Sequence, residues 1–110
     1  MPGNKRQKSF NEAEIVVLCG LFSVMDFSAG DDERIECKRI AAAFGRSPGT
    51  IDRQWRNIKD YLAGLPSGKT GQEVKRWTDV MLQDPRLVRS LAVYYCAERN
   101  WNLVDVLEAD

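Results

Sequence analysis

The sequence predicts an all-α fold, a compact domain of five to six helices that contains a helix-turn-helix. Capping signals for helix ends recur along the chain, and the apolar residues between them repeat with the 3.6-residue period of a helix. No segment shows the convincing alternation of a β-strand. A chain of 110 residues has the length of a single domain. We expect residues 1–9 to form a flexible basic arm and residues 10–110 to form the helical domain.

The first predicted helix begins after Asn11. Asn11 and Glu14 have the spacing of a capping box, and Phe10 and Ile15 occupy the two positions of a hydrophobic staple. Apolar residues then surround nearly the whole circumference of the helix over residues 15–25. Such a helix lies either in the centre of the core or partly in a subunit interface, and we favour the core.

Two further helices, separated by about three residues, are predicted next. Asp31 or Asp32 can cap the first of them. Gly45 suits the left-handed residue that follows a helix, and Ser47 and Pro48 supply the cap and the first position of the next helix. The helices are expected over about 32–44 and 48–63, with inward positions at Cys37, Ile40, Ala41 and Phe44 and at Ile51, Trp55, Ile58 and Leu62.

The rest of the chain predicts a loop over residues 64–71 and then three more helices. Thr70 and Glu73 have the spacing of a second capping box, and Asp84 with Pro85 can cap and begin the following helix. The apolar faces of these two helices are expected at Val74, Trp77, Val80 and Met81 and at Leu87, Val88, Leu91, Ala92 and Tyr95, with a last short helix after Asn102.

The composition argues against an enzyme or a metalloprotein. The chain has no histidine, which removes the commonest general base and the commonest metal ligand. Cys19, Cys37 and Cys96 lie far apart and show no Cys-x-x-Cys spacing, so we expect buried thiols in a reducing cytoplasm rather than a zinc site. No apolar run approaches the roughly 18 residues that cross a bilayer. We therefore expect a cytoplasmic protein that needs no metal and no cofactor and makes no membrane contact.

The charges are unevenly distributed, although sixteen basic and sixteen acidic residues cancel over the whole chain. Residues 10–33 contain six acidic residues and no basic one, whereas residues 34–59 contain seven basic residues and two acidic ones. The basic arm adds Lys5, Arg6 and Lys8. A basic stripe that coincides with one short segment is typical of a nucleic-acid contact.

That segment also has the spacing of a DNA-binding helix-turn-helix. A helix that ends in Ala-x-x-Phe-Gly, a three-residue turn and a helix that begins with Ser-Pro indicate this motif over about residues 32–63. Opposite the apolar stripe of its second helix, Gly49, Arg53, Arg56 and Asp60 point outward, with Thr50 and Asn57 on one shoulder and Asp52 and Lys59 on the other.

These outward residue types suit the major groove of DNA. Arginine can bind guanine and asparagine or glutamine can bind adenine through paired hydrogen bonds, and the backbone amides at the start of a helix suit phosphates. The candidate DNA-binding residues are Arg46, Ser47, Gly49, Thr50, Arg53, Gln54, Arg56, Asn57 and Lys59.

Arg53 and Arg56 differ as candidates, because charged residues on a helix often serve only to solvate an exposed face. Arg56 has Asp52 and Asp60 four residues away on either side, so an ion pair within the helix can account for it. Arg53 has Gly49 and Asn57 at these positions. We therefore favour Arg53 as the base contact.

The segment from Gly45 to Ile58 resembles the N-terminal helix-turn-helix domain found on HNH-type restriction and phage endonucleases. In this family a Glu-x-x-x-Leu helix precedes a Gly-Arg-Ser/Thr-Pro turn and a helix that ends in an Asn-Ile/Phe-like pair. These places are occupied here by Glu14 to Leu18, Gly45 to Pro48 and Asn57-Ile58. The resemblance covers about residues 10–85 and implies recognition of phage DNA or modified DNA. An HNH nuclease needs histidines, which this chain lacks, so the resemblance implies DNA recognition without cleavage.

We therefore expect a non-enzymatic protein that reads double-stranded DNA, in transcription regulation or in restriction- or phage-related recognition. A homodimer or a protein partner is compatible with this function. The alternative is a helical protein-protein interaction adaptor without DNA binding, which is compatible with the zero net charge because many DNA-binding domains are clearly basic. A phosphate-loop reading of Gly64 to Thr70 fails because three residues, not four, separate its glycines. The basic arm is expected to lie along the minor groove, as in a homeodomain.

Overall fold

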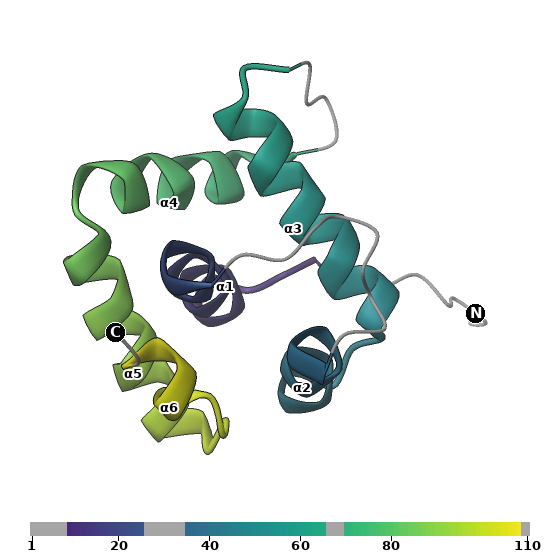
Figure 1. Cartoon of the computed structure of the whole chain (residues 1–110), viewed down its shortest axis with the longest axis vertical. Coiled ribbons are helices and arrows are strands. Elements are labelled where there is room, and N and C mark those ends of the chain that lie inside the picture. Colours follow the sequence, from purple (N-terminus) through teal and green to yellow (C-terminus); the bar gives the residue numbers. More distant parts are fainter. Residues whose placement is uncertain (1–8, 26–34, 66–69, 109–110) are drawn as a thin grey trace.

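Six α-helices, and no strand, make up the part of the chain that the computed structural model describes, which is residues 9–25, 35–65 and 70–108 (Figure 1). The all-α prediction is confirmed. The helices are α1 (Glu12–Val24), α2 (Ile35–Phe44), α3 (Pro48–Leu62), α4 (Gln72–Gln83), α5 (Pro85–Arg99) and α6 (Val104–Leu107).

α1 is the central helix of the fold. It contacts α4, α5 and α6, and Figure 1 shows it end-on with the other helices arranged around it. All nine residues from Ala13 to Leu21 are buried within this single chain. This burial confirms the core interpretation of the helix and explains why its sequence has no polar face.

Three of the helices begin where the capping signals predict. The Asn11 side chain accepts a hydrogen bond from the Glu14 backbone N–H at 2.9 Å, and the Glu14 side chain accepts one from the Asn11 N–H at 2.9 Å. Ser47 caps α3 and Asp84 caps α5, each directly before a proline at the first helical position. The starts of α1, α3 and α5 are therefore set by local sequence.

Two expectations about α4 and α5 are wrong. The cap of α4 is Gly71, which makes no side-chain hydrogen bond, so Thr70 and Glu73 do not form a capping box. Leu87 is 47% exposed rather than inward, because the buried face of α5 runs along Val88, Ala92 and Cys96. The expected cap at Asp31 or Asp32 lies outside the described residues, as does most of the arm.

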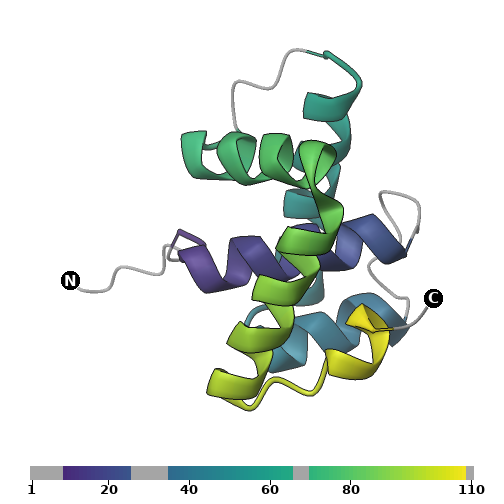
Figure 2. The same ribbon diagram turned by 90° about the vertical axis from the view of Figure 1, so that its left-hand side faces the viewer.

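α1 and α5 cross at close range. A Cβ atom on Gly20 would lie 2.8 Å from the Ala92 Cβ and 3.1 Å from the Leu107 Cδ2. Figure 2 shows α5 running across α1 at this crossing. The absence of a side chain at position 20 therefore sets the separation of the two helices.

Candidate nucleic-acid interface

The inner face of α3 holds this helix against the core. Ile51, Trp55 and Ile58 are buried, and Leu62 packs against the core at the end of the same stripe. The Trp55 ring lies 4.7 Å from the Phe22 ring of α1, measured between centroids. The stripe predicted from spacing is confirmed, and it fixes which residues of α3 face away from the molecule.

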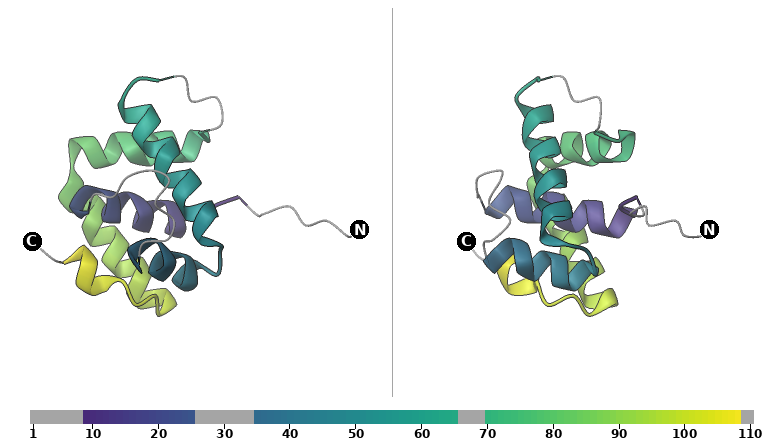
Figure 3. Two further views of the ribbon diagram at one scale, coloured as in Figure 1. Left: turned by 45° about the vertical axis from the view of Figure 1, so that its right-hand side comes forward. Right: turned by 90° about the vertical axis from the view of Figure 1, so that its right-hand side faces the viewer.

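A three-residue connection, residues 45–47, joins α2 to α3, and the two helices contact each other. Gly45 has the left-handed φ of +71° that its position predicts. The Arg46 N–H donates to the Ala41 carbonyl at 2.9 Å, and the Cys37 thiol donates to the Pro48 carbonyl at 3.3 Å. These bonds hold the start of α3 against α2 (Figure 3).

The outward face of α3 carries Gly49, Arg53 and Arg56, all exposed, and the half-buried Asp60. Arg56 donates to the Asp52 carboxylate at 3.2 Å, which is the ion pair expected within the helix. Arg53 makes no ion pair or hydrogen bond with the described part of the chain. Arg53 is thus the exposed arginine of α3 whose guanidinium N–H groups are not used by the described part of the chain.

Asp52 departs from its expected place on a shoulder of α3. Asp52 is only 7% exposed, so it lies against the body of the protein and does not face a DNA groove. Lys59 is half-buried on the same side of the helix. A lysine can still extend its ammonium group from such a position because its long aliphatic stem covers apolar surface.

Arg46 is a structural residue in this fold. Its guanidinium donates to both carboxylate oxygens of Glu14, at 2.8 and 2.9 Å, and to the Ser9 carbonyl at 3.0 Å. The guanidinium carbon also lies 4.1 Å from the centroid of the Phe10 ring. With 9% of its side chain exposed, Arg46 is occupied by these contacts, and we leave it out of the candidate interface.

The polar residues of α3 bind one another along its other side. The Ser47 and Thr50 hydroxyls lie 2.8 Å apart, and the Asn57 amide donates to the Gln54 amide oxygen at 3.2 Å. These hydrogen bonds orient side chains that were predicted as candidate DNA contacts. Gln54 and Asn57 are therefore held as a pair on one flank of the helix.

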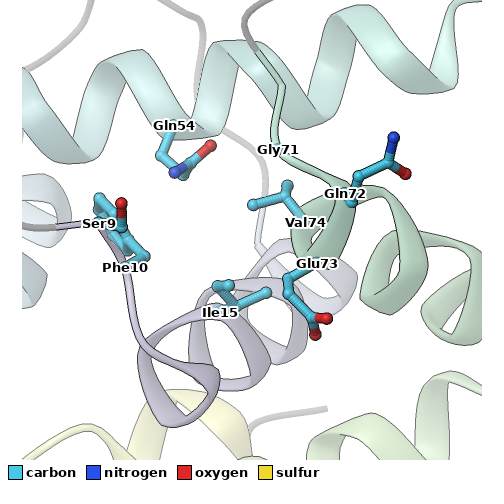
Figure 4. A pocket seen from close by; sticks show the side chains of 8 residues that line it. All are labelled: Ser9, Phe10, Ile15, Gln54, Gly71, Gln72, Glu73 and Val74. Atoms are coloured by element: carbon cyan, nitrogen blue, oxygen red, sulfur yellow. The ribbon is translucent and has the colours of Figure 1, made fainter.

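A pocket of about 380 Å³ lies beside Gln54. Ser9 and Phe10, the start of α1, Gln54 and the start of α4 line it, and Figure 4 shows these side chains around the space. Sequence patterns do not indicate this pocket, because its residues come from three stretches of the chain that only the fold brings together. Its importance here is that it places Ser9 next to α3.

The described residues offer no cluster of three potential metal ligands. None of the helices in these ranges is long and apolar enough to cross a membrane. Burial raises the pKa of Cys19 to about 12, against a smaller opposite effect of its hydrogen bond to Thr78, and burial raises the pKa of Cys96 to about 11. Both thiols are therefore neutral side chains of the core at physiological pH.

Comparisons with known proteins return no match. No family model fits the chain, and no curated protein or solved structure is significantly similar to it.

Proposed function

We propose that this protein binds double-stranded DNA and inserts the outward face of α3 into the major groove. The proposal rests on Arg53, an exposed arginine in the first half of α3. Its guanidinium N–H groups have no hydrogen-bond or ion-pair partner among the described residues. Helix-turn-helix proteins read bases with the first residues of their second helix. Arg53 has the guanidinium geometry that binds the O6 and N7 atoms of guanine.

The surroundings of Arg53 suit close contact with DNA. Gly49 lies one turn before it and is exposed without a side chain, so a base pair can approach the helix backbone there. Asp60, two turns after Arg53, adds a negative charge to the outward face near the end of α3, away from the flank that carries Lys59. The charge pattern thus directs the DNA to the first half of the helix.

The remaining candidates have separate roles in this proposal. Gln54 and Asn57, oriented by their mutual hydrogen bond, are suited to adenine. Lys59 and the backbone amides at Ser47 and Gly49 are suited to phosphates. The Thr50 N–H is not among these donors, because it already donates to the Ser47 hydroxyl at 3.2 Å. Arg56 contributes less, because Asp52 already neutralises part of its charge. No group in this set supplies cleavage chemistry, and we propose a reader of DNA rather than an enzyme.

The resemblance to the recognition domains of HNH-type endonucleases supports a role in restriction- or phage-related recognition or in transcription regulation. Binding to DNA would also place the protein with the nucleoid in the cytoplasm. A homodimer would double the contact by binding two half-sites.

A second candidate function is a protein-protein adaptor, favoured by one observation. Leu82, Leu87 and Tyr94 are 62%, 47% and 59% exposed on α4 and α5. α5 lies across α1 from α3, whereas α4 contacts both α1 and α3 (Figure 1). An adaptor would use this surface, so substitutions there and substitutions on α3 distinguish the two functions.

A salt titration with a fluorescent duplex tests DNA binding. The affinity should fall as the salt concentration rises between about 50 and 200 mM, because phosphates that bind cationic side chains release counterions. Selection from a random duplex pool should yield a sequence preference that Arg53→Ala relaxes and Lys59→Ala leaves in place, while Lys59→Ala weakens binding to all duplexes.

Arg86→Ala is the matched control, since Arg86 is an exposed arginine on α5. Arg86→Ala should change neither the sequence preference nor the salt dependence of DNA binding. If Arg53→Ala keeps the sequence preference of the unmodified chain, α3 does not read bases through this residue. If the unmodified chain shows no salt-dependent binding to DNA, the proposal is overturned.

A further inference from the structure

A second pocket lies between α5 and the end of α6, two helices that contact each other. Its volume is about 250 Å³, and we call it the α5–α6 pocket. The residues that line it are Arg86, Arg89, Ser90 and Val93 of α5 together with Leu107 and Glu108. The four residues of α5 are spaced by three, one and three positions, so they lie on one face of the helix. Two arginines and a hydroxyl are therefore gathered beside one hollow of the surface.

The two arginines of this pocket have no partner among the residues that the structure describes. Neither guanidinium forms an ion pair or a hydrogen bond there, although Glu108 lines the same pocket and Asp84 caps the helix just before Arg86. Arginines elsewhere in the described chain do pair with carboxylates, namely Arg39, Arg46, Arg56, Arg76 and Arg99. The α5–α6 pocket thus carries two positive charges that the described chain does not neutralise.

Arg89 distinguishes this pocket from an ordinary exposed surface. Its Nε atom is buried and has no hydrogen-bond partner in the described ranges. Buried N–H groups normally have a partner, because leaving one without an acceptor costs free energy. The Arg89 Cα lies 3.6 Å from the position that a Cβ atom on Gly20 would take, so the backbone below the side chain is held against α1. The fold therefore fixes the base of an arginine whose charge is unmatched.

The chemistry of the pocket favours a small oxyanion. A guanidinium binds phosphate or carboxylate through paired N–H groups, and the Ser90 hydroxyl can donate a further hydrogen bond. Two guanidiniums suit a phosphate group better than a carboxylate, because phosphate carries more than one negative charge near neutral pH. The volume of about 250 Å³ is below the roughly 300–1,000 Å³ of pockets that enclose drug-sized molecules. The pocket is therefore suited to one phosphate group.

We propose that Arg86, Arg89 and Ser90 bind a phosphate group, as the free ion or as part of a small phosphate ester. Glu108 brings a negative charge to the same pocket and lowers the affinity. The site is separate from the proposed DNA interface, because α5 lies across α1 from α3 (Figure 1). The inference therefore goes beyond DNA binding and does not depend on it.

A titration followed through backbone amide NMR signals measures binding at single residues. Inorganic phosphate, glycerol phosphate and acetate are added in parallel at constant ionic strength. Both phosphate compounds should give saturable shifts at Ser90 and Glu108, with a higher affinity than acetate. Tighter binding of glycerol phosphate than of inorganic phosphate identifies the ester as the preferred form, and the reverse order identifies the free ion. Shifts that do not saturate, or equal affinity for acetate, overturn the proposal.

Variants of equal charge change test the residues. Arg89→Gln should weaken phosphate binding by about tenfold or more, as expected for loss of a hydrogen bond to a charged group. Arg99→Gln is the matched control, because Arg99 lies on the same helix, pairs with Glu98 at 2.7 Å and does not line the pocket. It should keep the affinity of the unmodified chain. Equal losses in these two variants would show a general effect of charge and overturn the site.

Two exposed positions keep the test independent of folding. Arg86→Gln should weaken phosphate binding, whereas Glu108→Gln should strengthen it by up to about fivefold, because it removes a like charge from the pocket. Thermal unfolding checks that every variant folds. If Arg86→Gln and Glu108→Gln both leave the affinity unchanged, phosphate does not bind in the α5–α6 pocket.

A duplex added to the labelled chain separates this site from DNA binding. It should shift the amide signals of α3 and leave that of Ser90 in place. A shift of Ser90 that inorganic phosphate reverses would assign the pocket to the DNA backbone and overturn a separate site for a small ligand. If the chain binds no DNA, the phosphate titration still decides this inference, since none of its residues belongs to α3.

Discussion

The Glu14 carboxylate and the Arg46 guanidinium meet through two hydrogen bonds of 2.8 and 2.9 Å, although 32 positions separate them in the sequence. Their side chains are only 5% and 9% exposed. Glu14 also completes the capping box of α1. One carboxylate therefore connects the start of the central helix to the connection between α2 and α3.

Glu14→Gln should be strongly destabilising. It leaves the Arg46 guanidinium buried without its counter-charge, and removal of one partner of a buried ion pair costs about 3–5 kcal/mol. Urea unfolding should show a free energy of unfolding lower by about 3 kcal/mol. The control is Glu12→Gln, because Glu12 is half-exposed and lies 3.7 Å from Arg76; this change should cost less than about 1 kcal/mol. Equal losses for the two variants would contradict the assignment.

Gly20→Ala should destabilise the fold, although alanine normally favours a helix over glycine. Its new methyl group would lie 2.8 Å from the Ala92 Cβ, and overpacking of this kind costs about 1–3 kcal/mol. Thermal and urea unfolding measure the loss. Adding Ala92→Gly to Gly20→Ala should recover part of it, and a double variant no more stable than the sum of the single changes would argue against the close crossing.

The buried thiols predict loss of stability at high pH. Burial raises the pKa of Cys19 from 9.0 to about 12 and that of Cys96 from 9.0 to about 11. Above pH 9 the unfolded chain therefore releases thiol protons that the folded chain retains, and the free energy of unfolding falls by up to about 1.4 kcal/mol per pH unit for each thiol. Urea unfolding between pH 7 and 10.5 measures this decrease.

The matched comparison is Cys19→Ala/Cys96→Ala, which should have a shallower pH dependence over the same range even if it is less stable throughout. At pH 8, a disulfide reagent should modify the folded chain slowly and the urea-unfolded chain quickly. Rapid modification of all three thiols in the folded chain would contradict their burial.

The ion pair between α2 and α6 predicts an effect at low pH. Arg39 donates to Asp105 at 2.6 Å and to the Asn102 carbonyl at 2.7 Å, and the hydrogen bond from Arg39 lowers the pKa of Asp105 below its ordinary value of 3.8. The unfolded chain therefore binds a proton at Asp105 at a higher pH than the folded chain does. The stabilisation is complete above pH 3.8 and is lost as the pH falls through the folded-state pKa.

Asp105→Asn should consequently reduce the difference in unfolding free energy between pH 6 and pH 3. Glu108→Gln, which removes another exposed acid near the same end of the chain, is the comparison. If both variants keep the full difference, the Arg39 contact does not contribute to acid sensitivity.

The pairing of Arg56 predicts unequal effects within α3. Because Asp52 lies 3.2 Å from Arg56, Arg56→Gln should weaken DNA binding by less than half of the effect of Arg53→Gln on the logarithmic scale. Anisotropy titrations at a single salt concentration compare the two directly. A larger effect for Arg56→Gln would mean that Arg56 leaves Asp52 when DNA is bound.

Features set by neighbouring residues could be predicted from the sequence. Asn11, Ser47 and Asp84 cap their helices because each needs only a backbone N–H two or three residues away. The buried stripe of α3 follows from the helical period alone. The pair of Arg56 and Asp52 was likewise indicated by their spacing of four residues.

Features set by distant partners could not be predicted. Arg46 resembled a phosphate contact because the basic stripe was visible and its partner, Glu14, was far away in the sequence. Leu87 and Val88 are adjacent apolar residues in α5, and only the position of α1 decides which of them is buried. Ser9 and Gln54 are brought to one pocket by the fold itself.

The central position of α1 has a consequence for the synthesis of the protein. α1 leaves the ribosome before α5 and α6, which pack against it from later in the chain. At about 5–20 residues per second, the roughly 60 residues between α1 and α5 take several seconds to translate. For that time the nascent chain carries α1 without the helix that crosses it at Gly20, so the domain completes its folding only after α5 has been synthesised.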